Sequence, residues 1–255
     1  TYRELDALAN RFAHWAKGRG LRKGDTVAVV LPNRIEFLAV WIGLAKVGIV
    51  SALVNNNLSG TPLAHCLRIS AAVHVIADTD TAEAIEQVRP QLARSVMLWV
   101  LGLRAEDETS DRRGLDSPVR GASTVRPDRS IRADMTAAET VLYIFTSGTT
   151  GLPKAAKMTH ARVQTYMRAF AGATDARETD VVYCALPLYH ATGGVCAEAS
   201  PAPVASESSA SPLPSPSGLA STSTVDAGAI ASGWTCPAAS SVAVAPEVIM
   251  KLASA

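Results

Sequence analysis

Short apolar runs alternate with segments of helical periodicity along most of the chain. The first such segment runs from Leu5 to Trp15, where apolar residues recur at the spacing of one helix face, and the pattern stops at Gly18. Thr1 and Glu4 have the spacing of a capping box, which predicts that this helix begins with the first residues of the given sequence. The chain is therefore expected to open with an amphipathic helix.

The same alternation continues as far as residue 186. Further helices are predicted at 35–42, 62–70, 81–88 and 163–170. Strands are predicted at 26–31, 49–54, 73–77, 96–102, 140–145 and 181–186. This order predicts an α/β fold, a layered parallel sheet with helices on both faces. Residues 104–139 are polar and interrupted by prolines, and are predicted to form a long surface connection.

One apolar stretch, "FLAVWIGLAKVGIVSALV" at 37–54, has the length of a membrane span and carries a single charge, Lys46. It is either a membrane-spanning helix or a buried helix that leads into a buried strand. A lysine at the middle of a span is costly in a bilayer, and Gly43 and Gly48 interrupt the stretch. We therefore favour the buried helix and strand.

The composition changes at about residue 197. Ser, Ala and Pro dominate 197–255, Lys251 is the one basic residue there, and no helical or strand periodicity is found. The sequence thus predicts a folded domain at 1–196 and a disordered tail at 197–255. A frame-shifted reading of GC-rich coding DNA would give this composition, as would a genuine low-complexity linker. The abruptness of the change favours the frame shift.

The composition of the chain indicates which classes of binding partner and cofactor are not expected. The net charge is +1, so a nucleic-acid partner is not expected. The four cysteines, Cys66, Cys184, Cys196 and Cys236, have no metal-like spacing and predict reduced thiols in a cytoplasmic protein. The histidines are also scattered, so no metal site is predicted, whereas peripheral association with a membrane stays open.

The stretch "YIFTSGTTGLPK" at 143–154 combines a short apolar strand with a dense group of small and hydroxyl-bearing residues. Phosphate binding needs inward backbone N–H groups, hydroxyls and a cation. The turn and the hydroxyls come from Thr146, Ser147, Gly148, Thr149, Thr150 and Gly151. Pro153 stiffens the exit of the loop and Lys154 supplies the positive charge. The stretch therefore predicts a phosphate-binding loop rather than an ordinary turn.

A Walker P-loop is the main competing motif for such a stretch. It requires four residues between its glycines and a lysine directly after the second glycine. Here Gly148 and Gly151 are three residues apart, and Lys154 comes three residues after Gly151. The spacing excludes a P-loop.

The stretch "YIFTSGTTGLPKAAKMTH" closely resembles the signature of the adenylate-forming (AMP-binding) enzymes, the superfamily of acyl-CoA synthetases and luciferases. "TYRELDALANRFA", "GDTVAVVLPNRIEFLAVWIGLAKVGIVSALVNNNL" and "PLAHCL" are most similar to the branch of fatty acid transport proteins and very-long-chain acyl-CoA synthetases. "LPLYHATGG" resembles the next motif along the family. The resemblance extends from residue 1 to about 196.

The resemblance implies ATP-dependent activation of a long-chain fatty acid to an acyl-adenylate, followed by thioester formation with CoA. By similarity, the residues from Thr146 to Gly151 hold the β- and γ-phosphates, with Lys154 at the end of the loop. His190 matches the histidine that orients the carboxylate beside the acyl site. His190 and Lys154 are therefore the catalytic candidates. ATP and Mg²⁺ are the implied cofactors, CoA is the co-substrate, and the other histidines are expected to be structural.

The sequence departs from the family pattern after residue 196. No Tyr-Gly-x-Thr-Glu string occurs, so the family's magnesium-binding glutamate has no counterpart here. The ribose-binding aspartate and the lysine of the family's C-terminal domain have no match either. Two hypotheses follow. The chain belongs to an active fatty acid–CoA ligase lineage in truncated form, or it is a catalytically inactive remnant that keeps only the nucleotide-phosphate loop.

Overall fold

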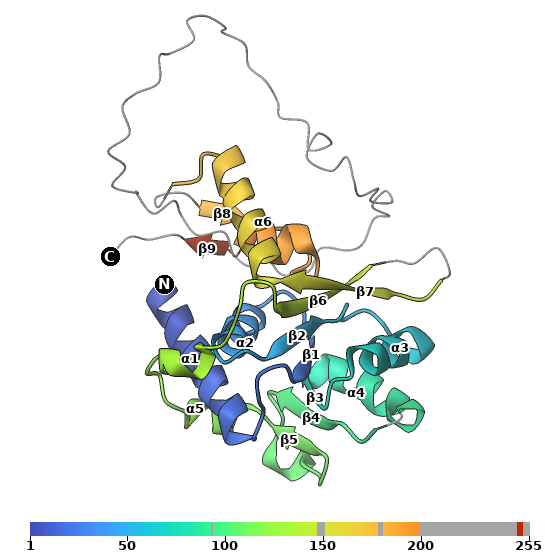
Figure 1. Cartoon of the computed structure of the whole chain (residues 1–255). Coiled ribbons are helices and arrows are strands. Elements are labelled where there is room, and N and C mark those ends of the chain that lie inside the picture. Colours follow the sequence, from blue (N-terminus) through green and yellow to red (C-terminus); the bar gives the residue numbers. More distant parts are fainter. Residues whose placement is uncertain (93, 147–150, 178–180, 199–248, 252–255) are drawn as a thin grey trace, which may run out of the picture. The chain divides into compact units, whose positions relative to one another are not determined.

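A seven-stranded sheet forms the centre of the computed structural model, which describes residues 1–92, 94–146, 151–177, 181–198 and 249–251 (Figure 1). Its strand order is β5-β4-β3-β1-β2-β6-β7. In chain order these are β1 (Thr26–Val30), β2 (Val50–Leu53), β3 (His74–Asp78), β4 (Met97–Leu101), β5 (Arg112–Gly114), β6 (Thr140–Thr146) and β7 (Lys154–Thr159). Neighbouring strands are parallel, except that β7 is antiparallel to β6.

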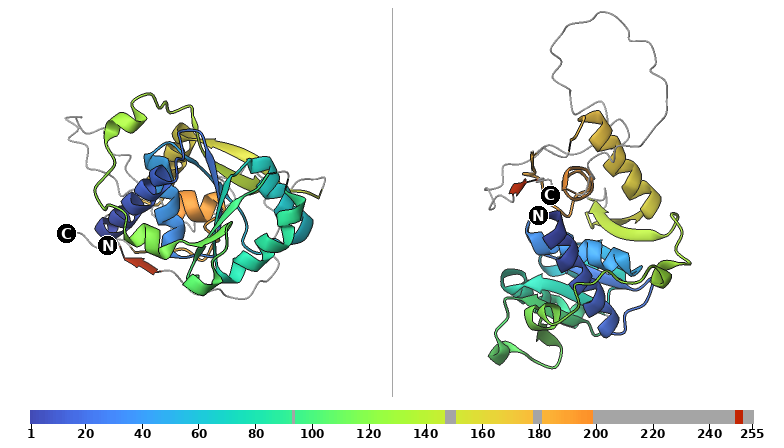
Figure 2. Two further views of the ribbon diagram at one scale, coloured as in Figure 1. Left: turned by 90° about the horizontal axis from the view of Figure 1, so that it is seen from below. Right: turned by 90° about the vertical axis from the view of Figure 1, so that its left-hand side faces the viewer.

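Helices cover both faces of this sheet (Figure 2). They are α1 (Tyr2–Gly18), α2 (Ile35–Lys46), α3 (Gly60–Ser70), α4 (Thr79–Val88), α5 (Asp116–Arg120) and α6 (His160–Ala173). One buried cluster joins α1, α2 and α5 to the sheet, and a second joins α3 and α4 to its other face. The predicted parallel α/β arrangement is confirmed. Its central strand, β1, is buried at every residue.

The N-terminus of α1 has the predicted capping box. The Thr1 hydroxyl accepts a hydrogen bond from the Glu4 backbone N–H at 3.3 Å, and the Glu4 carboxylate accepts one from the Thr1 ammonium at 2.7 Å. This reciprocal pair satisfies donors that the first turn of a helix leaves open.

The apolar stretch 37–54 forms most of α2 and all of β2, as predicted. No helix in the described ranges combines the length and the apolar character that crossing a bilayer requires. Lys46 at the end of α2 is nearly buried, and its ammonium donates to Asp6 at 2.5 Å and to Asn10 at 2.6 Å, both on α1. Arg126 also lies 3.3 Å from Asp6. The one charge of the apolar stretch is thus neutralised by the neighbouring helix.

Partial burial by itself raises the pKa of Asp6, but the hydrogen bond and charge of Lys46, with Arg126 and Asn10, outweigh it and hold this pKa below its ordinary value. A lowered folded-state pKa contributes stability above the unfolded pKa of about 3.9, and this contribution is lost as the pH falls below that value. We expect Asp6→Asn to cost about 1 kcal/mol at pH 7, since the carboxylate is partly solvent-screened, and almost nothing near pH 2. Urea unfolding at several pH values measures the difference.

The matched control is Glu106→Gln, because Glu106 is exposed and has no ion pair in the part of the chain that the structure describes. This variant should leave the free energy of unfolding unchanged at both pH values. A cost of Asp6→Asn that stays constant with pH would contradict the assignment.

Two predicted features are corrected at the edges of the sheet. The connection 104–139 contains the edge strand β5 and helix α5, which sequence pattern missed because β5 is a short, charged strand whose pairing with β4 defines it. β7 was also missed, since "KAAKMT" has no apolar alternation and becomes a strand through its pairing with β6.

The strand predicted after α6 is shorter in the structure. The predicted strand 181–186 is only β8 (Val181–Tyr183), which pairs antiparallel with β9 (Ile249–Lys251) instead of joining the main sheet. β9 is a strand in the segment for which no strand periodicity was found. A π-helix, η4 (Ala191–Glu198), follows the LPLYH segment. The rest of the predicted tail, and with it the prediction of disorder, lies outside the described residues.

Candidate functional site

The predicted phosphate loop connects the two strands of the β6–β7 hairpin. Thr146 ends β6 and is paired with Lys154, the first residue of β7. The Thr146 hydroxyl also donates to the Lys154 carbonyl at 3.5 Å. Thr146 and Lys154 are thereby brought together at the base of one loop. The four other predicted loop residues, Ser147, Gly148, Thr149 and Thr150, lie outside the described residues.

The described end of the loop runs from Gly151 to Lys154 and carries an exposed positive charge. Gly151 has φ +87°, a left-handed conformation that favours glycine, and no atom approaches within 4 Å of where a Cβ would be. Lys154 is exposed, and its ammonium has no carboxylate partner among the residues described. Lys154 was predicted as the end of a loop, but it is the first residue of a strand. Its backbone is therefore held by the sheet while its charge is available to an anion.

His65 on α3 supports this loop from outside. One of its ring nitrogens lies 3.0 Å from the Pro153 carbonyl, and a carbonyl can only accept, so the ring donates. The sequence assigned His65 a structural role alone. No local pattern could have found this contact, because His65 and Pro153 are 88 residues apart.

His190 lies between β8 and η4. Its backbone N–H donates to the Pro187 carbonyl at 3.1 Å, and its carbonyl accepts from the Gly194 N–H at 2.9 Å. His190 is exposed, but its ring packs 4.7 Å from the Tyr189 ring, between centroids, and partial desolvation lowers the pKa of the imidazole. His190 is therefore neutral at pH 7 and can donate or accept a proton.

The two catalytic candidates lie on separate segments. Within the described ranges, no hydrogen bond or ion pair joins His190 to Thr146, Gly151 or Lys154. A second residue that the sequence did not single out, Asn33, does contact the segment that leads to His190. The sequence pattern of this residue, an asparagine directly after a buried strand, is typical of a loop and gave no specific indication.

Two more of the histidines that were expected to be structural, His14 and His74, have hydrogen-bond partners within the fold. A ring nitrogen of His14 lies 2.8 Å from the Val125 carbonyl, and the Trp99 indole donates to His74 at 2.9 Å. Burial raises the pKa of the Cys66 thiol to about 11, so this thiol is protonated at pH 7. The Cys66 thiol is therefore not a nucleophile at neutral pH.

Magnesium, which the resemblance implies, needs a set of oxygen ligands that usually includes carboxylates. In the described part of the chain, no three His, Cys, Asp or Glu side chains gather as metal ligands would. The described groups at the base of the loop are a hydroxyl and an ammonium, Thr146 and Lys154. This donor set does not fit a resident magnesium ion, and no chemical step is assigned to one.

A mostly parallel sheet with helices on both faces defines a protein of the α/β class. The family described as AMP-binding enzyme matches residues 1–203. The chain belongs to this family.

The relatives of the chain include the long-chain fatty acid transport protein 1 of Mus musculus, to which it is 39% identical over 196 residues. The match covers 76% of this chain and 30% of the relative, so the chain spans less than a third of the length of that protein.

Solved structures give the same fold. The anthranilate CoA ligase AuaEII, in complex with anthranoyl-AMP, is similar with a TM-score of 0.68 at 22% identity, over 76% of this chain and 37% of that one. A fatty acyl CoA synthetase of Mycobacterium tuberculosis is similar with a TM-score of 0.59 at 27% identity, over 76% of this chain and 36% of that one.

Proposed function

We propose that this chain forms the phosphate-binding part of a fatty acid–CoA ligase, an enzyme that converts a long-chain carboxylate to an acyl-adenylate and then to a CoA thioester. The observation that carries the proposal is the β6–β7 hairpin, whose loop begins at Thr146 and ends beside the exposed charge of Lys154. The names of the fatty acid transport protein and the fatty acyl CoA synthetase support a fatty carboxylate as the substrate.

In the first step of this reaction, a carboxylate oxygen attacks the α-phosphorus of ATP and pyrophosphate leaves. Negative charge develops on the leaving pyrophosphate, so a fixed cation at the phosphates stabilises the transition state more than the ground state. Lys154 provides this charge from a strand that the sheet holds in place. The neutral His190 imidazole donates a hydrogen bond to the fatty carboxylate and orients the attacking oxygen.

The proposal predicts that the chain binds inorganic pyrophosphate through Lys154. We expect Lys154→Ala to weaken binding by about 1 to 3 kcal/mol, which is about 5- to 150-fold, because a charged hydrogen bond is lost. Isothermal titration calorimetry of the wild type and the variant with pyrophosphate, and then with ATP, measures the change.

Lys157→Ala is the matched control. Lys157 lies on the same strand and is also exposed, but it is three residues from Lys154 and so its side chain points to the opposite face of the hairpin. This variant should change the affinity less than twofold. Equal loss in both variants would reduce the effect to net charge and would remove the loop from the proposal.

The alternative is a chain that binds phosphate without catalysis. It is favoured by the absence of a match to the family's magnesium-binding glutamate in the sequence. Incubation of the 255 residues with palmitate, ATP, magnesium and CoA separates the two functions. Palmitoyl-CoA formation that disappears in Lys154→Ala supports the ligase, whereas pyrophosphate binding without thioester supports the alternative.

A further inference from the structure

The side chain of Asn33 joins the end of the central strand to the segment that carries His190. Its amide N–H donates to the Leu186 carbonyl at 2.9 Å, and its amide oxygen accepts from the Leu188 N–H at 2.8 Å. The Leu186 carbonyl can only accept and the Leu188 N–H can only donate, so the two bonds fix the orientation of the amide. Asn33 reaches across 153 and 155 residues of sequence to make them.

Asn33 lies just beyond the fully buried central strand of the sheet. β1 lies in the middle of the sheet, with β2 and β3 on either side, and each of its residues is buried. Asn33 follows this strand after Pro32 and precedes α2, whose buried face packs on the same sheet. A side chain in this position can fix the position of a loop that is distant in sequence relative to the sheet.

Two glycines of η4 pack closely against the backbone of the same segment. A Cβ on Gly193 would lie 2.5 Å from the Pro187 carbonyl oxygen, and a Cβ on Gly194 would overlap the Leu188 carbonyl oxygen. Gly194 also donates its N–H to the carbonyl of His190. The backbone from 186 to 190 therefore contacts both the amide of Asn33 and the close-packed backbone of η4.

We propose that Asn33 is a positioning residue that sets the place of His190 at the acyl site, through its two hydrogen bonds to Leu186 and Leu188. The proposal rests on the proposed function, since it gives His190 its role toward the fatty carboxylate. Only a primary amide of this length supplies one donor and one acceptor to these two backbone groups. An aspartate would set a carboxylate oxygen against the Leu186 carbonyl, and an alanine would leave both backbone groups without this partner.

The test uses the titration of His190 in the intact chain, followed by proton NMR of the imidazole signals and assigned with His190→Gln. Partial desolvation lowers the pKa of His190 although the residue is exposed, so the midpoint reports the packing of the ring on Tyr189. The one titratable ring in contact with it is Tyr189, among the residues described. In Asn33→Ala the midpoint is expected to rise toward the ordinary histidine value, because the released segment no longer holds the ring against Tyr189.

Asn33→Asp keeps the acceptor for Leu188 and loses the donor, so its midpoint should also rise. The matched control is Asn56→Ala, a half-buried asparagine that follows the neighbouring strand β2 and whose side chain hydrogen-bonds only Asn57 in the described structure. It should leave the titration of His190 unchanged. The signals of His14, His65, His74 and His160 report whether each variant is folded. An unchanged midpoint in both folded Asn33 variants overturns the proposal.

Addition of octanoate separates this proposal from the proposed function. In the wild type, octanoate should shift the His190 signal, and in Asn33→Ala this shift should be lost, while pyrophosphate affinity stays within twofold. If octanoate leaves the wild-type signal unchanged, the acyl role of His190 fails even when Asn33 controls its midpoint. If octanoate shifts both proteins equally, Asn33 has no positioning role.

Discussion

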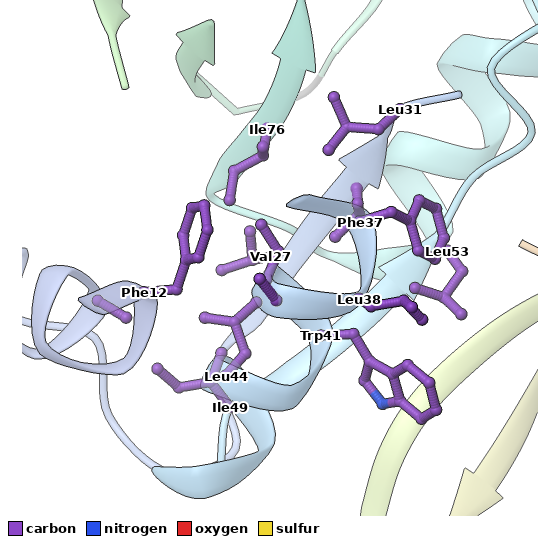
Figure 3. Packing of buried hydrophobic residues seen from close by; sticks show 14 of the residues in the cluster. Phe12, Val27, Leu31, Phe37, Leu38, Trp41, Leu44, Ile49, Leu53 and Ile76 are labelled. Carbon is purple, nitrogen blue, oxygen red and sulfur yellow. The ribbon is translucent and has the colours of Figure 1, made fainter. Parts of the chain in front are cut away.

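Phe37→Ala is expected to lower the free energy of unfolding by about 3 to 5 kcal/mol. Phe37 is on the inner face of α2 and is fully buried in the cluster that also contains Leu31, Leu53 and Ile76 (Figure 3). Removal of its ring costs the transfer free energy of the apolar atoms and leaves a cavity that packed neighbours close only partly. Urea unfolding followed by circular dichroism measures the loss.

Phe37→Leu is the control for this prediction. It keeps most of the apolar volume and removes the aromatic shape, so it should cost less than about 1.5 kcal/mol. A cost of Phe37→Ala below that of Phe37→Leu would contradict the packing in Figure 3.

Gly43→Ala is expected to destabilise the fold by about 2 to 3 kcal/mol, although alanine is the better helix former. A Cβ at Gly43 would approach the Phe12 Cβ to 2.8 Å and the Ala13 backbone nitrogen to 3.1 Å, and would also overlap the Ala9 carbonyl oxygen. Two of these contacts are backbone atoms of α1, which cannot rotate away. α1 and α2 would have to separate, and part of the cluster between them would be lost.

Gly172→Ala gives the opposite expectation. Gly172 is in α6, and no atom lies within 4 Å of where its Cβ would be. The substitution should leave stability unchanged or raise it by up to about 1 kcal/mol, through helix propensity alone. Thermal unfolding of the two variants decides the point, and the same sign of change in both would show that the contact of Gly43 with α1 is not decisive.

Gly43 illustrates where sequence pattern reaches its limit. In the sequence it interrupts an apolar stretch, and this interruption helped to argue against a membrane span. In the structure it lies directly against the backbone of α1, near Ala9 and Ala13. The correct conclusion about the stretch was available from local sequence, but the reason for the glycine was not, because it depends on residues about thirty positions earlier in the chain.

The sequence likewise predicted one part of the candidate site and missed another. The small residues and the lysine of 143–154 predicted a phosphate loop after a strand, and Thr146 and Lys154 do pair at its base. The contacts of His65 with Pro153, and of Asn33 with the segment before His190, had no sequence pattern. Each joins residues far apart in the chain, through polar groups that are common in any loop.

The sequence by itself determined the order of helices and strands from α1 to β4, the strand β6, the burial of both faces of the sheet and the position of a loop after β6. These features follow from the spacing of apolar residues and from glycine and hydroxyl content, which are local properties of the chain. Only the tertiary structure decided that β5 and β7 are strands, that β7 runs antiparallel and that Asn33 holds the His190 segment. The physical reason is that edge-strand pairing and long-range hydrogen bonds draw their free energy from a partner segment, and the local pattern of neither segment specifies that partner.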